Sequence, residues 1–448
     1  MRKNHLLILI TSLLAITFSS CSTNNPEPDL FNGYEINNEH AVRPTSGIQQ
    51  ISIYGINDFH GAIKEDGYQM GLGYLGSFMK QRMLEQNSLF IDSGDTWQGS
   101  LESNYNRGKL INEVFENAKL SAKTVGNHDF DWGTDVLADN VKNSKIPNLA
   151  ANVFDYTWST KKMGNKQQEQ FGKSYATYVL DNGLKVGIIG TIGEDQITSI
   201  CTPLVQNIAF AEQTQKIKDI SDFLRTKKNC DVIIASSHSS FDQMDSISLT
   251  KVSSVSNKRY VDLVLNAHTH QKESYKINDV YFAQFGGYGE VIGEIKMYYN
   301  FSTNQLVDSS TNITSYSSYQ VKQELSYTVD TEIQSIIDRY DAQTKDIGSQ
   351  VLSEKFDGSF YSSEQLPNLM TEAIALEAEK EGFSVDFAYT NVARASHYST
   401  EITYSDLYNI FPFDNAVPVI KVSGKDACNM LRYRNKIYIH WSFRFWLD

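Results

Sequence analysis

The sequence predicts a layered α/β fold in which short buried strands alternate with amphipathic helices. From residue 51 onward, β-rich runs such as ISIYGIN and SLFIDSGD alternate with helical stretches such as YLGSFMKQRMLEQ and INEVFENAK. This alternation is typical of α/β sandwiches and layered sheets. The pattern recurs through KVGIIGTIG, EQTQKIKDISDFLRTKK, CDVIIASSH and VDLVLNAHTH. Each apolar run ends in polar residues that are capable of chemistry.

Length and composition indicate a folded protein with more than one domain. A chain of 448 residues suggests two or three domains, and we expect two. Hydrophobic residues make up 41% and charged residues 21%, which excludes the disordered class. The net charge of −13 argues against a nucleic-acid polymer as partner, because duplex binding depends on clusters of Lys and Arg. A small phosphate ester is compatible with this charge, because bound divalent cations reverse the local field.

The N-terminus predicts export. Arg2 and Lys3 precede the apolar run LLILITSLLAITF, which is shorter than the roughly 20 residues of a membrane span. Small residues then end on Cys21, so residues 1–21 look like a bacterial lipoprotein signal whose cysteine is acylated and anchors the chain in the cell envelope. Plain secretion and a retained anchor are the alternatives. Residues 22–47 are polar and proline-rich, which predicts a flexible tether.

The remaining chain divides into two expected domains. A catalytic domain is expected over 48–326, and its last part has antiparallel-looking segments that could close a second sheet. Apolar residues at helical spacing predict a connecting helix over 327–348. A second α/β domain is expected over 349–448, with a helix around Gln365 to Lys380 and a strand in SVDFAYT.

The first two candidate site motifs are weak when taken alone. Asp58 and His60 follow the first strand and, two residues apart, would share one face of an extended chain. A hydrogen-bonded surface histidine is the commoner explanation of such a pair. Asp95 follows the next strand after Gly94, and a glycine allows the tight turn that presents a carboxylate at the strand's end. An ordinary aspartate between strand and turn explains it equally well.

The later motifs are more specific. In TVGNHDFDWG, Asn127 is an oxygen ligand for a divalent metal, and Asp131 is placed to fix the imidazole of His128. His238 ends DVIIASSH, and VDLVLNAHTH ends in a His-x-His pair, which is a good metal signal in its own right. Five histidines thus fall at strand ends, which random placement does not explain.

The combined set of side chains predicts a two-metal site. Two Asp, one Asn and four His form a mixed oxygen and nitrogen set that suits Mn, Zn, Fe or Co rather than Ca or Mg. Two such ions about 3.5–4 Å apart, bridged by a carboxylate, clamp the attacking and leaving oxygens of an in-line displacement, so phosphoryl transfer is the natural reaction. The candidate ligands are Asp58, His60, Asp95, Asn127, His238, His268 and His270.

These motifs resemble the calcineurin-type metallophosphoesterases, specifically the bacterial family of 5′-nucleotidases, UDP-sugar hydrolases and 2′,3′-cyclic-nucleotide phosphodiesterases. The resemblance implies a four-layer α/β/β/α sandwich and two divalent ions bridged by Asp95. It also implies attack by metal-bound hydroxide, with His128, held by Asp131, stabilising the transition state or protonating the leaving group. The implied first site is Asp58, His60, Asp95 and His270, and the second is Asp95, Asn127, His238 and His268.

The resemblance extends less well to the second domain. There Arg394 matches a substrate-binding arginine, Phe413 would stack on the base and Asn415 would hydrogen-bond it. A core role for Phe413 and a solvated surface role for Arg394 are the alternatives. The stretch KFDGSFYSSEQLPNL lacks the family's further arginines and has Pro367 where the family has glycine. The last residues, RYRNKIYIHWSFRFWLD, resemble nothing in the family, which favours a truncated or frame-altered substrate domain.

The sequence therefore favours hydrolysis of nucleotide phosphate esters, with nucleoside 5′-monophosphates as substrates and UDP-sugars as further ones. One alternative is a 2′,3′-cyclic-nucleotide 2′-phosphodiesterase with 3′-nucleotidase activity, which shares the metal site. Another is a non-catalytic nucleotide-binding lipoprotein whose C-terminal domain has decayed, and a third is an enzyme with weak activity on small esters. The sequence gives no indication of the oligomeric state.

Overall fold

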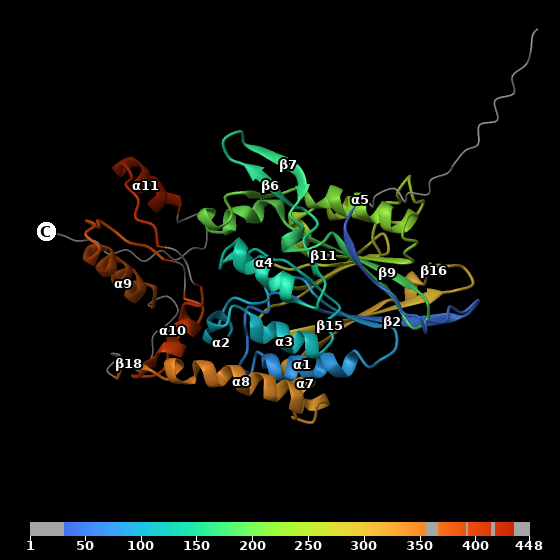
Figure 1. Ribbon diagram of the computed structural model, residues 1–448, viewed down its shortest axis with the longest axis horizontal. Helices are drawn as coiled ribbons and strands as arrows, with labels where there is room; N and C mark the ends of the chain where they lie inside the picture. The colour runs from blue at the N-terminus through green and yellow to red at the C-terminus, as the bar shows by residue number, and fades with distance from the viewer. Residues whose placement is uncertain (1–30, 355–365, 391–392, 414–416, 434–448) are drawn as a thin grey trace, which may run out of the picture. The chain divides into compact units, whose positions relative to one another are not determined.

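The computed structural model (Figure 1) describes residues 31–354, 366–390, 393–413 and 417–433. Several predictions concern residues outside these ranges: the signal ending at Cys21, the first part of the tether, Asn415 and the last 15 residues. Among the described residues, no helix combines the length and the apolar character needed to cross a membrane.

The first of two large sheets is mainly parallel at its centre. β9, β11, β12 and β14 run parallel in that order, and β8 and β13 add antiparallel neighbours. Its strands, in spatial order, are β1 (Gly33–Ile36), β8 (Tyr175–Val179), β9 (Lys185–Ile192), β11 (Val232–His238), β12 (Leu263–Leu265), β14 (Val280–Phe285) and β13 (Lys272–Ile277).

The second large sheet contains the first strands of the catalytic domain. β2, β3, β4 and β5 run parallel, and β15 pairs antiparallel with β2 and β17. Of the segments after residue 272, β15, β16 and β17 extend this second sheet, as predicted, whereas β13 and β14 belong to the first. The strands are β16 (Gln305–Leu306), β15 (Val291–Asn300), β2 (Ile48–Ile56), β3 (Ser88–Asp92), β4 (Ala122–Thr124) and β5 (Asn148–Leu149), with β17 (Asn312–Ser317) paired to β15.

The two sheets pack face to face over a shared apolar core. Ile53 and Ile91 of the second sheet and Ile188 and Ile234 of the first are fully buried in one cluster. Strands that are covered on both faces carry near-continuous apolar runs, and for this reason the strands are easy to recognise in the sequence.

Helices cover the outer face of each sheet (Figure 1). Leu75, Phe115 and Ile333, from three helices, share a core with the second sheet, and Ile220 packs with the first. The arrangement confirms the predicted four-layer α/β/β/α sandwich. Over the second sheet lie α1 (Gly71–Arg82), α3 (Lys109–Asn117), α4 (Thr134–Asn143) and α8 (Thr331–Gly348), and over the first lies α5 (Gln213–Thr226). Shorter helices are α2 (Leu101–Tyr105), α6 (Ser246–Leu249) and α7 (Ser318–Glu324).

The predicted connecting helix is α8. It begins at Thr331 because the Asp330 carboxylate accepts hydrogen bonds from the free backbone N–H groups of Glu332 and Ile333. Such a cap satisfies donors that the first helical turn leaves without partners.

A small separate sheet lies beside the sandwich. β10 and β7 both pair antiparallel with β6, so that the β6–β7 hairpin is held along one side by the segment that ends in β10. Its strands are β10 (Ile208–Phe210), β6 (Val153–Thr157) and β7 (Lys162–Gln167).

The described part of the C-terminal region consists mainly of helices. Its apolar cluster is small and contains Leu366, Ala393, Ile402 and Ile410. The strand predicted in SVDFAYT is wrong: residues 384–390 are irregular, because none of the described residues forms a ladder with them. The elements are β18 (Val351–Ser353) paired with β19 (Ile402–Thr403), and α9 (Leu366–Lys380), α10 (Tyr404–Ile410) and α11 (Gly424–Tyr433).

The tether predicted over 22–47 is also partly wrong. β1 lies within it and pairs parallel with β8. Arg43 then makes two hydrogen bonds, of 2.7 and 2.9 Å, to the carboxylate of Asp231. Polar composition does not prevent a segment from serving as an edge strand, because such a strand needs backbone pairing more than apolar side chains.

Candidate metal centre

The candidate ligands come from the C-terminal ends of strands in both sheets. Parallel strands in neighbouring positions end at the same edge of a sheet, where side chains from separate loops can meet. In the second sheet, Asp58 follows β2, Asp95 follows β3 and Asn127 follows β4; in the first, His238 ends β11, and His268 and His270 follow β12.

The loops that carry these ligands have strained backbones. β2 ends at Ile56, and Asp58 (φ 50°) and His60 (φ 46°) are left-handed, so the prediction that they share a face of an extended chain is wrong. Their side chains converge instead because a turn is tied to the next loop, through Asp58 N–H to the Gly94 carbonyl and His60 N–H to the Asp95 carbonyl, both at 2.9 Å. Asp95, His268 and His270 are also left-handed, with φ of 54°, 75° and 54°.

The first group of ligand atoms belongs to Asp58, His60 and His270, which all lie within 4.8 Å of one another. The Nε2 atoms of the two histidines are 3.3 Å apart, and Nε2 of His270 is 3.4 Å from Oδ1 of Asp58. The Asp58 carboxylate also accepts a hydrogen bond of 2.9 Å from the backbone N–H of His268. This contact links the ligand loops of the two sheets.

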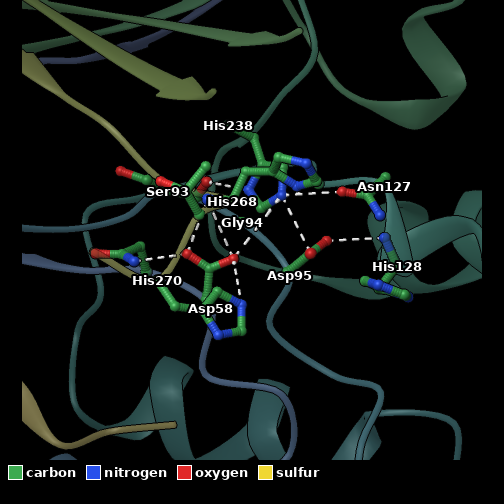
Figure 2. A network of polar contacts seen from close by, with 12 residues as sticks. Asp58, Ser93, Gly94, Asp95, Asn127, His128, His238, His268 and His270 are labelled. Carbon is green, nitrogen blue, oxygen red and sulfur yellow. Dashed lines mark hydrogen bonds and ion pairs between the residues drawn. The ribbon is translucent and has the colours of Figure 1, made fainter. Parts of the chain in front are cut away.

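The second group consists of Asp95, His238 and His268, also within 4.8 Å (Figure 2). Nε2 of His238 lies 3.1 Å from Oδ2 of Asp95 and 3.2 Å from Oδ1 of Asn127. Oδ2 of Asp95 is also 3.8 Å from Nε2 of His60 in the first group. Asp95 therefore lies between the two groups.

The chemistry of these atoms fits divalent cations. Nδ1–H of His60 donates to the Gln98 carbonyl at 3.2 Å, and Nδ1–H of His238 donates to the Ser93 carbonyl at 2.9 Å. Each histidine thereby directs Nε2, with its lone pair in the neutral form, at other acceptor atoms, and backbone carbonyls commonly fix metal-binding imidazoles in this way. Lone pairs on neighbouring nitrogen and oxygen atoms repel one another, so a metal cation or a proton has to lie between them.

The pKa values of His60 and His238 indicate which of the two imidazoles carries a proton in the metal-free chain. Burial lowers the pKa of His60 to about 3, so this imidazole is neutral. Burial also disfavours charge on His238, but the Asp95 carboxylate outweighs it and raises the pKa of His238 to about 9. A proton on His238 thus stands between the acceptors, and a metal ion that binds there has to displace it.

His128 and Asp131 form a pair beside the second group. Nδ1 of His128 is 2.7 Å from Oδ2 of Asp131, and the backbone N–H of His128 donates to Oδ1 of Asp95 at 2.8 Å. Burial acts to lower the pKa of His128, but the carboxylates of Asp95 and Asp131 raise it overall. The imidazolium form is therefore favoured next to the candidate metal ligands.

The C-terminal region places Phe413 against His128 and His60, with Arg394 next to Phe413. The Phe413 ring stacks on His128 at 4.7 Å and 22° and meets His60 edge-on at 6.1 Å. The Arg394 guanidinium lies over the Phe413 ring at 4.9 Å. The Pro412 carbonyl accepts hydrogen bonds from Gln98 at 2.7 Å and Asn104 at 3.2 Å, so this segment is held against the ligand loops.

The sequence also matches known families over most of its length. A model of the family described as calcineurin-like phosphoesterase matches residues 51–272, and one described as 5′-nucleotidase, C-terminal domain, matches residues 344–442. The chain belongs to the calcineurin-like phosphoesterases of the 5′-nucleotidase type. Members of this family are hydrolases that bind divalent metals, and the two ligand groups lie within or directly beside the matched phosphoesterase domain.

Individual proteins match the chain at low identity. Endonuclease YhcR of Bacillus subtilis is 25% identical over 84% of this chain, which spans only 32% of that longer protein. An apyrase of Tabanus yao is 24% identical over 84% of this chain and 71% of its own length. The solved structure of a 5′-nucleotidase precursor from Thermus thermophilus superposes with a TM-score of 0.70 at 20% identity, covering 88% of this chain and 81% of that one.

Tyr288, which follows β14, is a further residue of the site that the sequence did not predict. Its ring lies 5.3 Å from the ring of His60 and 5.2 Å from that of His270, and its backbone N–H donates to the Asp58 carbonyl at 2.7 Å. It therefore contacts all three members of the first group from a left-handed backbone position (φ 54°). Its position in GGYG, after a buried strand, is a signal for a strained turn that could have identified it.

A buried charged cluster below the second group was also missed. Asp129 accepts hydrogen bonds from the backbone N–H groups of Thr96 at 3.2 Å and Gly126 at 3.0 Å, which ties the Asp95 loop to the Asn127 loop. Lys123, 1% exposed, lies 3.5 Å from Asp129 and over the ring of Trp97. No sequence signal distinguishes these residues from solvated surface charges.

Asp92, whose pKa is affected by the charges of Lys123 and Asp129, is expected to make the stability of the protein depend on pH. Burial raises the pKa of Asp92 from 3.8 to about 7, although Thr96 donates a 2.6 Å hydrogen bond to it. The folded state favours the protonated acid of Asp92. The contribution of this proton to the free energy of unfolding is therefore complete below pH 4 and is lost as pH rises toward 7. In the metal-free protein, the free energy of unfolding should therefore fall relative to Asp92→Asn by on the order of 4 kcal/mol across this window.

Denaturant unfolding of both proteins at pH 4, 5.5 and 7 measures this difference. The exposed carboxylate of Asp135 offers a control, since Asp135→Asn should track the wild type at every pH. A constant difference between wild type and Asp92→Asn would show that Asp92 ionises normally in the folded protein.

Proposed function

We propose that this chain is a metal-dependent phosphoric ester hydrolase that acts on nucleotides in the manner of a 5′-nucleotidase. The observation that carries the proposal is the geometry around Asp95. Its carboxylate lies between two groups of metal-ligating atoms and accepts a hydrogen bond from His128, which is itself held by Asp131. A binding module would have no need for the His128–Asp131 pair.

Two divalent ions are the cofactors we propose, with Mn, Zn, Co or Fe as candidates on the basis of the imidazole-rich donor set. Asp58, His60 and His270 would hold one ion, and Asn127, His238 and His268 the other, with Asp95 shared. When bound, such ions supply the positive charge that activates water for attack and neutralises the phosphoryl oxygens.

His128 and Asp131 have separate roles in this proposal. Because the pKa of His128 is raised, the imidazolium is available to stabilise the transition state or to give its Nε2 proton to the leaving oxygen of the ester. The carboxylate of Asp131 accepts the Nδ1–H bond, which fixes the ring orientation and leaves Nε2 free to face the substrate.

The choice of a nucleotide rests on the C-terminal region. The match to the 5′-nucleotidase C-terminal domain and the names of the relatives favour a nucleoside phosphate. Arg394 and Phe413 lie beside the phosphoesterase ligands, where a cation suits phosphate and an aromatic ring suits a base. We propose these two residues and Asn415, which is outside the described residues, as the substrate-binding set.

Assays with purified, Mn²⁺-loaded protein test the proposal. We expect release of phosphate from AMP and cleavage of UDP-glucose, with about two ions per chain by elemental analysis. Because one relative is named an endonuclease, 2′,3′-cyclic AMP belongs in the panel as a phosphodiester. The same assay on cell fractions tests the expected export, which predicts activity in the envelope fraction.

The alternatives give distinct results. Preference for 2′,3′-cyclic AMP over AMP would assign the chain to the phosphodiesterase alternative. A metal-free, inert protein that still binds AMP would favour the non-catalytic lipoprotein. If p-nitrophenyl phosphate is the only ester hydrolysed, the proposed metal centre is supported and the proposed nucleotide substrate is rejected.

A further inference from the structure

A second pocket lies away from the metal centre, between the β6–β7 hairpin and the segment that leads into β10. Its volume is about 570 Å³, within the roughly 300–1,000 Å³ typical of small-molecule sites. The hairpin contributes Tyr156 and Trp158, and the facing segment contributes Thr202, Gln206 and Asn207. A smaller hollow of about 220 Å³ shares Pro203, Gln206 and Asn207 with it, so the two hollows adjoin, and together they are called the trough.

The two walls of the trough are fixed relative to each other by backbone hydrogen bonds. Tyr156 N–H donates to the Asn207 carbonyl at 2.8 Å, and β6 pairs with β10 from Ile208 opposite Asp155 onward. The backbone of both walls is therefore fixed by the small sheet. Such pre-formed sites lose less free energy to ordering when they bind a ligand.

An exposed aromatic platform forms one part of the trough. The indole of Trp158 is 51% exposed, which is unusual for so large an apolar ring. Tyr156 meets it edge-on, with centroids 5.2 Å apart and the rings at 83°. This T-shaped contact braces the indole while half of its surface stays accessible.

The rest of the lining is polar and carries no charge. Every residue that lines the pocket and the adjoining hollow is neutral, although charged residues make up 21% of the chain and its net charge is −13. Within the described part of the chain, the side chains of Thr157, Gln206 and Asn207 make no recorded hydrogen bond. Their donors and acceptors are therefore free for a ligand. A phosphate or carboxylate would find no cation in this trough.

We propose that this trough binds a neutral saccharide chain. A pyranose ring presents an apolar C–H face, which matches the flat indole of Trp158, and a rim of hydroxyl groups, which matches the amides of Gln206 and Asn207. The adjoining second hollow favours an oligosaccharide over a single sugar, because it offers polar side chains next to the first pocket. A nucleoside also has a flat ring and no charge, and it is the competing ligand that the experiment has to separate.

Titration of the full-length, metal-loaded protein with neutral oligosaccharides tests the proposal by calorimetry and tryptophan fluorescence. The probes are the hexamers of β-1,4-glucose, α-1,4-glucose, β-1,4-xylose and N-acetylglucosamine, with adenosine as the nucleoside. We expect at least one hexamer to bind, and Trp158→Ala to raise its Kd by about tenfold or more. Trp158→Phe should lose less, because it keeps an aromatic face.

Two controls separate binding from damage to the protein. Tyr319→Ala removes another exposed aromatic ring, on α7, and should leave the Kd unchanged. Hydrolysis of p-nitrophenyl phosphate should be the same in Trp158→Ala as in the wild type, because Trp158 is not among the residues proposed for the metal centre.

Three results would overturn the proposal. These are failure of all four hexamers to bind at millimolar concentration, binding that Trp158→Ala leaves unchanged, and Trp158-dependent binding of adenosine without any saccharide. Since hydrolysis and saccharide binding are measured separately, a chain that lacks phosphatase activity can still support this inference, and an active one can still refute it.

Discussion

Replacing Asp95 with Ala should remove both metal ions and lower hydrolysis of AMP by at least about a thousandfold. The expected effect is the largest in the chain because one carboxylate serves two groups. Its Oδ2 lies 3.1 Å from Nε2 of His238 and 3.8 Å from Nε2 of His60, and its Oδ1 accepts the backbone N–H of His128. Elemental analysis and initial rates on the same protein preparation measure both losses.

The surface carboxylate of Asp135, in the first turn of α4, provides the matched control. Asp135→Ala should keep about two ions and wild-type rates. If the Asp95 variant retained one ion at full occupancy, the carboxylate would belong to a single site and the shared role would be rejected.

Replacing His128 with Ala should lower kcat for AMP by about a hundredfold to ten-thousandfold while the metal content stays at about two ions per chain. The ring is paired with Asp131 and is outside both ligand groups, and the backbone N–H that contacts Asp95 is retained in the variant. Asp131→Asn should have a smaller effect, because it weakens the orientation of the ring without removing the proton donor.

The choice of substrate makes this prediction diagnostic. p-Nitrophenolate leaves without needing a proton, so the loss for p-nitrophenyl phosphate should be much smaller than the loss for AMP if His128 protonates the leaving group. Equal losses on both esters would instead assign His128 to charge stabilisation at phosphorus. The exposed imidazole of His40 serves as a control, and His40→Ala should leave both rates unchanged.

Much of the sandwich could be predicted because its central strands are buried on both faces. Runs such as KVGIIGTIG and CDVIIASSH, which correspond to β9 and β11, are buried at every position except Lys185 and Asp231 and so stand out as apolar blocks. The polar residues that end these blocks converge for a topological reason, since parallel neighbours end at one edge. The candidate ligands between residues 58 and 270 could therefore be predicted to lie close together from the order of the strands alone.

Other features depend on contacts that no local pattern encodes. Nothing near Lys123 or Asp129 shows that they are buried, because their partners come from separate loops. β1 was taken for tether because its pairing partner β8 lies about 140 residues away. The extended conformation assumed for Asp58 and His60 failed because β2 ends two residues before Asp58.

The left-handed ligands also imply a conflict between stability and activity in this protein. Asp58, His60, Asp95, His268 and His270 each adopt a backbone conformation that costs about 1 kcal/mol for a residue with a Cβ and little for glycine. Backbone strain alone would therefore favour glycine at all five positions. With Asp and His at these positions, the backbone of the candidate metal ligands costs the fold several kcal/mol in all, and a stabilised variant that keeps activity has to gain its stability elsewhere.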